Sequence, residues 1–220
     1  MPGENPFSTR FVRPGAIPYR FSPERDLTRL LDRFQQIGRT GQIVCPHGGG
    51  KSTLLADLVR LWEQNGERVT VFELHDGQRR LPVHLVGLLR DTPTTLIAVD
   101  GYEQLNWCAR RALRRFCRRR QIGLIVTSHR SMGIPDLARC APSLALLEQL
   151  VRGLLPDGSP QIDCESVRRA FHRHAGNVRE VLFELYDLYE AGATDRATTA
   201  EENITDSSLE KSPGPTRPTP

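Results

Sequence analysis

The sequence predicts an α/β protein built on a parallel sheet with helices on both faces. Two observations lead to this prediction. Short apolar runs that suit buried strands lie at residues 43–46, 68–74, 94–100 and 123–128. Between them lie longer segments in which apolar residues recur at helical spacing. Because parallel strands need long crossover connections, usually helices, this alternation favours a parallel sheet.

Each predicted strand has its own signature. Residues 43–46 run into a glycine-rich loop, and residues 68–74 (R-V-T-V-F-E-L) are rich in β-branched side chains. Residues 94–100 (T-T-L-I-A-V-D) and 123–128 (G-L-I-V-T-S) are continuously apolar, as expected of strands buried on both faces. No strand is predicted after Arg130, where the pattern turns helical.

The predicted helices follow the 3.6-residue period. In the first, Leu27, Leu30, Leu31 and Phe34 recur at helical spacing, and Asn65-Gly66 closes the second. The full set covers residues 26–37, 51–65, 81–90, 103–120, 143–155, 165–174 and 178–190.

Composition divides the chain into four parts. Residues 1–25 form an extended proline-rich arm, whose aromatic side chains predict that it packs on the rest of the protein. Residues 26–155 form the main α/β domain, and residues 156–190 form a small C-terminal helical lid. Residues 191–220 contain no aromatic side chain and many Thr, Ser, Pro and acidic residues, so we expect a disordered tail.

The most informative stretch is residues 45–53, which read C-P-H-G-G-G-K-S-T between a predicted strand and a predicted helix. Glycines let backbone N–H groups turn inward around phosphate oxygens, and the helix N-terminus adds positive charge. Lys51 would reach the β- and γ-phosphates, and the Ser52 hydroxyl would coordinate Mg²⁺. The residues predicted to bind the phosphates of ATP are Pro46, His47, Gly48, Gly49, Gly50, Lys51, Ser52 and Thr53.

One feature of this loop argues against a phosphate-binding role, and another argues for it. The full pattern G-x-x-x-x-G-K-[ST] requires a glycine where this chain has Cys45. The chain has 28 Arg but only two Lys, and the second, Lys211, lies in the predicted tail. A compact ammonium suits a phosphate clamp in a way that Arg does not, so the retention of Lys51 favours the phosphate-binding interpretation.

A second group of polar residues follows the later strands. Asp100 ends a buried strand, where it can hold Mg²⁺ opposite Ser52. Glu103, three residues on, is the candidate to orient or deprotonate the attacking water. The structural alternatives are a helix N-cap for Asp100 and a first-turn acid for Glu103.

The next strand ends in Thr127, Ser128 and His129, any of which could sense the γ-phosphate. Arg130 could contact that phosphate or reach a neighbouring subunit. Arg179, at the start of the last predicted helix, could fold over the nucleotide and couple closure to the γ-phosphate. The alternative for Thr127, Ser128 and His129 is ordinary polarity at the end of a strand. The alternative for Arg179 is a surface side chain in the first turn of a helix.

Together, residues 26–190 resemble the AAA+ ATPase superfamily or its close P-loop relatives. The resemblance is carried by Lys51-Ser52, Asp100, the strand ending at His129 and the helix carrying Arg179. The stretch 176–180 (G-N-V-R-E) is similar to the second sensor motif of bacterial enhancer-binding activators of that superfamily. The resemblance implies a three-layer P-loop nucleotide-binding domain with a small helical lid, ATP, Mg²⁺ and often assembly into rings of identical subunits. The departures are Cys45, the shifted Glu103 and a very short lid.

Composition bears on where the protein is expected to be located and on the state of its cysteines. The net charge is +4 over 220 residues, a mild basic excess. The chain has no apolar run of 18 residues and no signal-peptide core, so we expect a cytoplasmic protein without membrane insertion. Its five cysteines are scattered and form no C-x-x-C pair. We therefore expect free thiols in a reducing compartment rather than a zinc site or a redox pair.

One helix stands apart. Residues 110–120 contain seven Arg in eleven residues. Such a cationic face suits nucleic-acid phosphates or an acidic partner, and a merely solvated face is the alternative.

The sequence thus predicts a Mg²⁺-dependent ATPase. The main alternative is a nucleotide-dependent switch or nucleic-acid-binding adaptor with little turnover. A small-molecule kinase would need an acceptor pocket, and the absence of an L-S-G-G-Q-like signature argues against an ABC-transporter ATPase.

Overall fold

The structure, a computed structural model, describes residues 5–13, 16, 19, 26–75, 77–81, 93–155 and 162–192. Its strands are β1 (Thr40–Val44), β2 (Val69–Glu73), β3 (Leu96–Asp100), β4 (Gly123–Ser128) and β5 (Asp136–Arg139). Its helices are α1 (Thr9–Val12), α2 (Leu27–Gln36), α3 (Lys51–Gln64), α5 (Trp107–Arg120), α6 (Leu144–Leu154), α7 (Cys164–Arg173) and a C-terminal helix over residues 178–192, with a short 3₁₀ helix η1 (Tyr102–Gln104).

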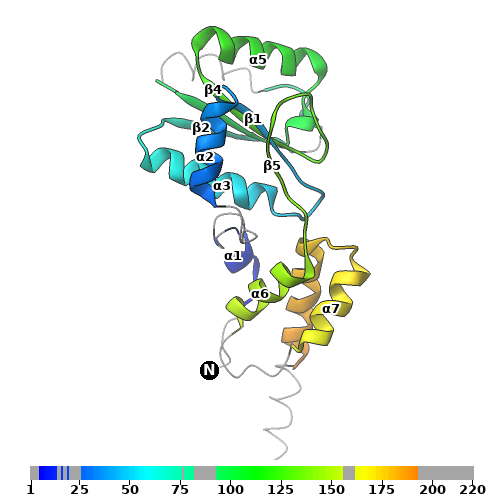
Figure 1. Cartoon of the computed structure of the whole chain (residues 1–220). Coiled ribbons are helices and arrows are strands. Elements are labelled where there is room, and N and C mark those ends of the chain that lie inside the picture. Colours follow the sequence, from blue (N-terminus) through cyan, green and yellow to red (C-terminus); the bar gives the residue numbers. More distant parts are fainter. Residues whose placement is uncertain are drawn as a thin grey trace, which may run out of the picture.

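The five strands form one sheet in the order β2-β3-β4-β1-β5, and every pair is parallel (Figure 1). The predicted α/β fold with a parallel sheet is therefore confirmed. Because all strands run the same way, their carboxyl ends meet at one edge, where open parallel sheets place ligands. β4 separates β1 from β3 at that edge.

The prediction that no strand follows Arg130 is wrong, because β5 does. β5 (D-L-A-R) pairs with β1, with Ile43 opposite Ala138. Its four residues contain only two apolar side chains and no β-branched one, so the sequence shows no strand pattern there. Pairing with β1, a long-range contact, supplies the strand conformation.

Helices cover both faces of the sheet. On one face α2 and α3 pack against the sheet around Phe34, Leu58 and Trp62. On the other face α5 packs through Leu113 and Cys117 against Leu124 and Val126 of β4. Alternate residues of the buried strands enter opposite clusters, as the two-residue period of a strand requires.

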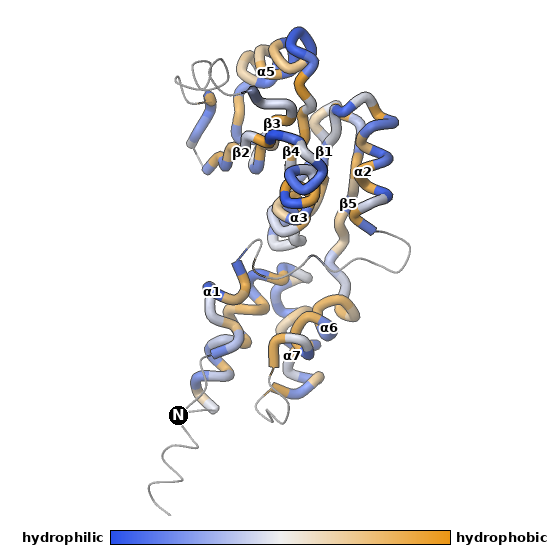
Figure 2. The backbone as a smooth tube through the Cα atoms, turned by 90° about the vertical axis from the view of Figure 1, so that its left-hand side faces the viewer, coloured by the Kyte–Doolittle hydropathy of each residue, from blue (hydrophilic) through white to orange (hydrophobic). Residues whose placement is uncertain are grey.

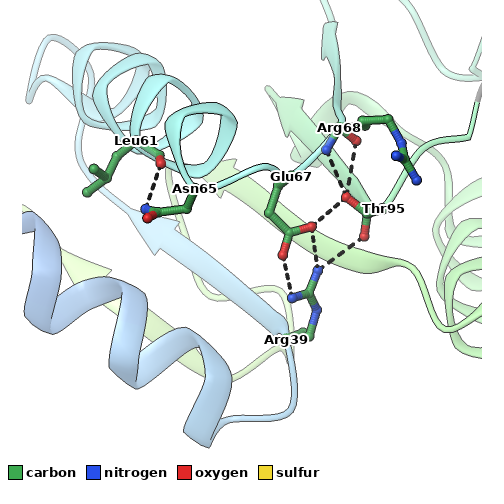
Figure 3. A network of polar contacts seen from close by, with 6 residues as sticks. All are labelled: Arg39, Leu61, Asn65, Glu67, Arg68 and Thr95. Atoms are coloured by element: carbon green, nitrogen blue, oxygen red, sulfur yellow. Dashed lines mark hydrogen bonds and ion pairs between the residues drawn. The ribbon is translucent and has the colours of Figure 1, made fainter.

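A polar network closes the opposite, amino-terminal edge of the sheet (Figure 3). The Arg39 guanidinium donates to both carboxylate oxygens of Glu67, at 2.6 and 3.0 Å, and also to the Thr95 carbonyl. These hydrogen bonds lower the pKa of Glu67 despite the opposing effect of its burial. The network joins the segments that precede β1, β2 and β3 and so fixes the register in which those strands start.

Helices α6, α7 and the C-terminal helix form a second cluster, which we call the helical unit (Figures 1 and 2). Helix α6 was predicted to belong to the main domain, but its residues Leu147 and Val151 pack with Val167 and Leu185. The helical unit therefore begins just after β5. Its three amphipathic helices have no sheet of their own, so they bury their apolar faces against one another.

The described residues of the N-terminal arm pack on the rest of the protein, and they include the short helix α1 where an extended segment was predicted. Phe7 is fully buried in the helical unit, and the Asn5 amide donates to the Tyr186 carbonyl and to Glu190. Farther along, the Tyr19 N–H donates to Asp57 on α3, at 2.6 Å. The arm thus contacts both units.

Two predicted segments, the helix at 81–90 and the disordered tail at 191–220, lie outside the described residues except at their ends. Within the part of the chain that is described, no helix has the length and apolar character needed to cross a membrane.

Candidate functional site

The glycine loop, residues 45–50, leads from β1 into α3. Gly48 and Gly50 have positive φ angles of 67° and 84°, a backbone region that favours glycine. Gly50 is the N-cap of α3, and no side chain caps that helix. The first N–H groups of a helix have no partner within it, and they carry a positive partial charge. The loop therefore presents, at the edge where the carboxyl ends of the strands meet, N–H groups of the kind that suit an anion.

The predicted loop residues divide by position. His47 to Thr53 line a cavity of about 380 Å³ between the loop and the helical unit. Pro46 does not line it, and its carbonyl instead accepts a hydrogen bond from the Gly49 N–H at 3.1 Å. Lys51 and Ser52 occupy the first turn of α3, at the base of the cavity.

The helical unit and the arm supply the other walls of this cavity. Arg179, an exposed residue at the start of the C-terminal helix, is one of the residues that line it. Asn177 lies so close to the loop that a Cβ on Gly48 would overlap its side-chain oxygen. The Tyr19 ring lies against Gly50, 3.0 Å from the position of a Cβ there. The remaining wall is mostly apolar and includes Val12, Leu146, Leu150, Leu182 and Phe183.

A carboxylate is fixed at the end of β3. Gly101 has a φ of 80°, and a Cβ there would lie 2.7 Å from the Leu74 carbonyl, so only glycine fits. Its N–H donates to the Thr127 hydroxyl, which in turn donates to Asp100 Oδ1. These bonds hold one oxygen of Asp100, and among the described residues no hydrogen bond is found for the second.

This geometry narrows the choice among the three polar residues that end β4. Thr127 is engaged with Asp100, and the Ser128 hydroxyl donates to the carbonyl of the exposed Arg130. Of the three side chains, that of His129 contacts the glycine loop: its ring stacks on that of His47, with centroids 3.4 Å apart. His129 is therefore the strand-end side chain that lies against the predicted phosphate-binding loop.

His129 also contacts Glu103, which η1 presents. His129 Nε2 lies 3.2 Å from Glu103 Oε1, and Nδ1 lies 3.2 Å from the Cys45 carbonyl. Because a carbonyl oxygen only accepts, the second contact requires a proton on Nδ1. Nε2 then carries a proton only in the imidazolium form, which is the form that pairs with the carboxylate.

The other oxygen of Glu103, Oε2, is buried without a hydrogen-bond partner among the described residues. A buried carboxylate oxygen without a partner is costly, and a bound water or ligand would satisfy it. The side chain is only 14% exposed, so its surroundings strengthen whatever contact it makes.

We predict that His129 titrates below pH 6.5. Burial, the nearby Lys51 ammonium and His47 lower its pKa, while Glu103 raises it. Glu103→Gln should therefore lower the pKa further, and Lys51→Ala should raise it; NMR of the imidazole follows both shifts. Because the folded state resists protonation, this group contributes stability above pH 6.5 that is lost as pH falls below it. Equal pKa values of His129 in the wild-type protein and both variants would show that Glu103 and Lys51 do not interact with the imidazole.

The expectation that all cysteines are free is wrong for two of them. Cys45 forms a disulfide with Cys140, 95 residues away. Cys45 follows β1 and Cys140 follows β5, which are parallel neighbours, and the Cys140 N–H donates to the Val44 carbonyl at 2.9 Å. Cys108, Cys117 and Cys164 are free, and burial raises the pKa of Cys117 to about 12. The bond links the glycine loop to the segment that leads into the helical unit.

Removing this bond should destabilise the oxidised protein. Cys140→Ser should lower the free energy of unfolding by about 2–4 kcal/mol, since the disulfide closes a long loop in the unfolded chain. Urea denaturation with and without dithiothreitol measures it, with the exposed Cys108→Ser as the matched control. The account requires that the difference between the variants disappear under reducing conditions. Equal stability of both variants without reductant would contradict it.

Within the described residues, no group of three or more His, Cys, Asp or Glu side chains could hold a metal ion by itself. The site instead offers isolated donors, the Ser52 hydroxyl and the free oxygen of Asp100, on either side of β4. Mg²⁺ in phosphate sites is bound by one or two such protein groups together with phosphate oxygens and water. The donor set fits that use.

Comparisons with known proteins add no identification: no protein-family model matches the chain, and no curated protein is found to be similar to it. The function is therefore argued from the geometry described above.

Proposed function

We propose that the protein binds ATP with Mg²⁺ at the glycine loop and hydrolyses it, as a P-loop protein resembling the AAA+ superfamily. The observation that carries the proposal is the position of two half-sites at one sheet edge. The uncapped start of α3, with Lys51 and Ser52, lies at the end of β1. Asp100 ends β3 and Glu103 follows it in η1, one strand beyond β4. A triphosphate needs both: donors for its oxygens and carboxylates for the metal and the water.

Each residue then has a role. The loop N–H groups and Lys51 bind the β- and γ-phosphates. Ser52 and Asp100 would hold Mg²⁺, which neutralises phosphate charge when it is bound. The apolar wall that includes Tyr19 and Leu182 suits the base, and Arg179 reaches the phosphates from the helical unit.

In the hydrolytic step, a water molecule attacks the γ-phosphorus as the bond to the β-phosphate oxygen breaks, which yields ADP and phosphate. The unpartnered Glu103 Oε2 would orient this water and accept its proton. Burial and the nearby Lys51 lower the pKa of His129, which favours the neutral imidazole and leaves the Glu103 carboxylate without a paired imidazolium in that form. His129, between the loop and Glu103, would sense whether the γ-phosphate is present.

A nucleotide-dependent switch with little turnover is the second candidate. It is favoured by the position of His129 Nε2, 3.2 Å from Glu103 Oε1, because a protonated His129 would pair with that oxygen and occupy half of the carboxylate. Steady-state phosphate release from ATP with Mg²⁺ distinguishes the two. Sustained release that requires Mg²⁺ is the result expected of the ATPase. Saturable ATP binding without release would identify the switch, and the absence of both would overturn the proposal.

A further inference from the structure

The positive charge of this protein is concentrated on one helix. α5 contains seven Arg and no Asp or Glu among its 14 residues. The net charge of the chain is +4, so all the rest carries −3, with 23 basic and 26 acidic residues. No acidic residue occurs between Glu103 and Asp136. The ATP site proposed above does not use this charge.

The helix has two distinct faces. Leu113 and Cys117 are buried against the sheet. At 100° per residue, four residues lie within about 80° of one another on the opposite face. We call them the arginine stripe; they are Trp107, Arg111, Arg115 and Arg118. All four are exposed, and Figure 1 shows α5 far from the helical unit.

Some exposed arginines on other helices are paired with acids. Arg29, Arg168 and Arg173 lie on α2 and α7 and each contacts a carboxylate. In the described part of the chain, none of the stripe arginines has an ion pair. Self-repulsion among unpaired like charges is unfavourable, and a polyanion would relieve it.

An aromatic side chain accompanies the charge. Trp107 is 67% exposed, the highest value among the large apolar side chains that the structure describes as exposed. The Arg111 guanidinium lies 5.8 Å from the centre of its ring. An exposed indole beside cationic groups provides both a stacking surface for an unpaired base and contacts for the adjoining phosphates. An acidic peptide would use the charges but not the ring.

We infer that α5 binds single-stranded nucleic acid, with phosphates on Arg111, Arg115 and Arg118 and a base stacked on Trp107. This function goes beyond the proposed ATPase and does not depend on it. The helix is about 21 Å long, so it spans several nucleotides. Base stacking and phosphate contacts carry little sequence information, so the binding is expected to tolerate different sequences.

Fluorescence anisotropy tests the inference with labelled single strands of about 16 nucleotides, in DNA and RNA form. Three phosphate contacts at a slope of about 0.7 each predict a roughly 20-fold loss of affinity from 50 to 200 mM salt. The same oligonucleotide in duplex form should bind more weakly, because its bases are not free to stack. A polyglutamate peptide should compete poorly. No binding at 50 mM salt would overturn the inference.

The decisive variants are matched in charge. Replacing Arg111, Arg115 and Arg118 by Gln should abolish measurable binding, while replacing Arg29, Arg168 and Arg173 by Gln should leave most of it. Trp107→Ala should weaken binding about five- to 150-fold while changing the salt slope little. Arg110 is kept in all variants because it donates to the Glu103 carbonyl.

Three outcomes would overturn the assignment. Equal losses of affinity in the two triple variants would mean that binding depends only on the net charge of the protein. Equal affinity for duplex and single strand with no effect of Trp107→Ala would remove the stacking role. Competition by polyglutamate as strong as that by the oligonucleotide would indicate an acidic protein partner. Thermal unfolding of each variant verifies that the fold is retained.

Discussion

Replacing Glu103 by glutamine is expected to lower the rate of phosphate release by about 10²–10⁴-fold while ATP affinity changes little. The change removes the proton acceptor of the hydrolytic step, whose contribution to the rate is of that size. The amide is nearly isosteric, so η1 and its contacts should be retained. Steady-state phosphate release gives kcat, and calorimetry with a non-hydrolysable analogue gives the affinity.

The matched control is Glu63→Gln, an exposed acid on α3 that lies away from the sheet edge. It should leave kcat unchanged. If Glu103→Gln turned over as fast as the wild-type protein, Glu103 would have no catalytic role, and the account of its unpartnered oxygen would fail.

Replacing Lys51 by alanine is expected to weaken ATP binding by about ten- to 150-fold. This range corresponds to the loss of one charge-assisted hydrogen bond, about 1.5–3 kcal/mol. Phosphate release should fall below detection at moderate ATP concentrations. Lys51→Arg should restore binding poorly, because a planar guanidinium does not fit a site shaped for a compact ammonium.

Arg29→Ala, which also removes one positive charge but on the exposed face of α2, is the control for net charge. It should bind ATP as the wild-type protein does. An equal loss in both variants would mean that the affinity reflects overall charge, and Lys51 would then have no specific role.

The sequence predicted the parts of the fold that depend on local patterns. The strands β2, β3 and β4 and the helices α2, α3 and α7 were found close to their predicted positions, whereas β1 starts three residues and ends two residues earlier than predicted. These segments are long or strongly periodic, so neighbouring residues determine them. β5 was missed because its four residues acquire strand conformation only by pairing with β1.

In the candidate site, too, some features follow from the local sequence and others depend on tertiary packing. Lys51, Ser52 and Asp100 were predicted from residue type and spacing, and the sheet brings their elements to one edge. The roles of neighbours could not be predicted in this way. The Cys45–Cys140 bond requires β1 and β5 to be adjacent, and the contact of Asn177 with Gly48 requires the helical unit to meet the loop. Such contacts depend on tertiary packing, for which a single sequence carries no local signal.

The choice of His129 among three candidates is a similar case. Thr127, Ser128 and His129 all end the same strand, and their residue types are equally suited to a polar role. Only the partners distinguish them: Asp100 for Thr127, a backbone carbonyl for Ser128, and the loop with Glu103 for His129. Those partners come from three different segments of the chain.

Binding of ATP at the glycine loop can be measured by calorimetric titration of the full-length protein with a non-hydrolysable ATP analogue, with and without Mg²⁺. We expect saturable binding at one site per chain, which weakens when Mg²⁺ is omitted and when Lys51 is replaced by alanine. Absence of saturable binding in the presence of Mg²⁺, or binding that is unchanged in Lys51→Ala, would contradict the proposed ATP site.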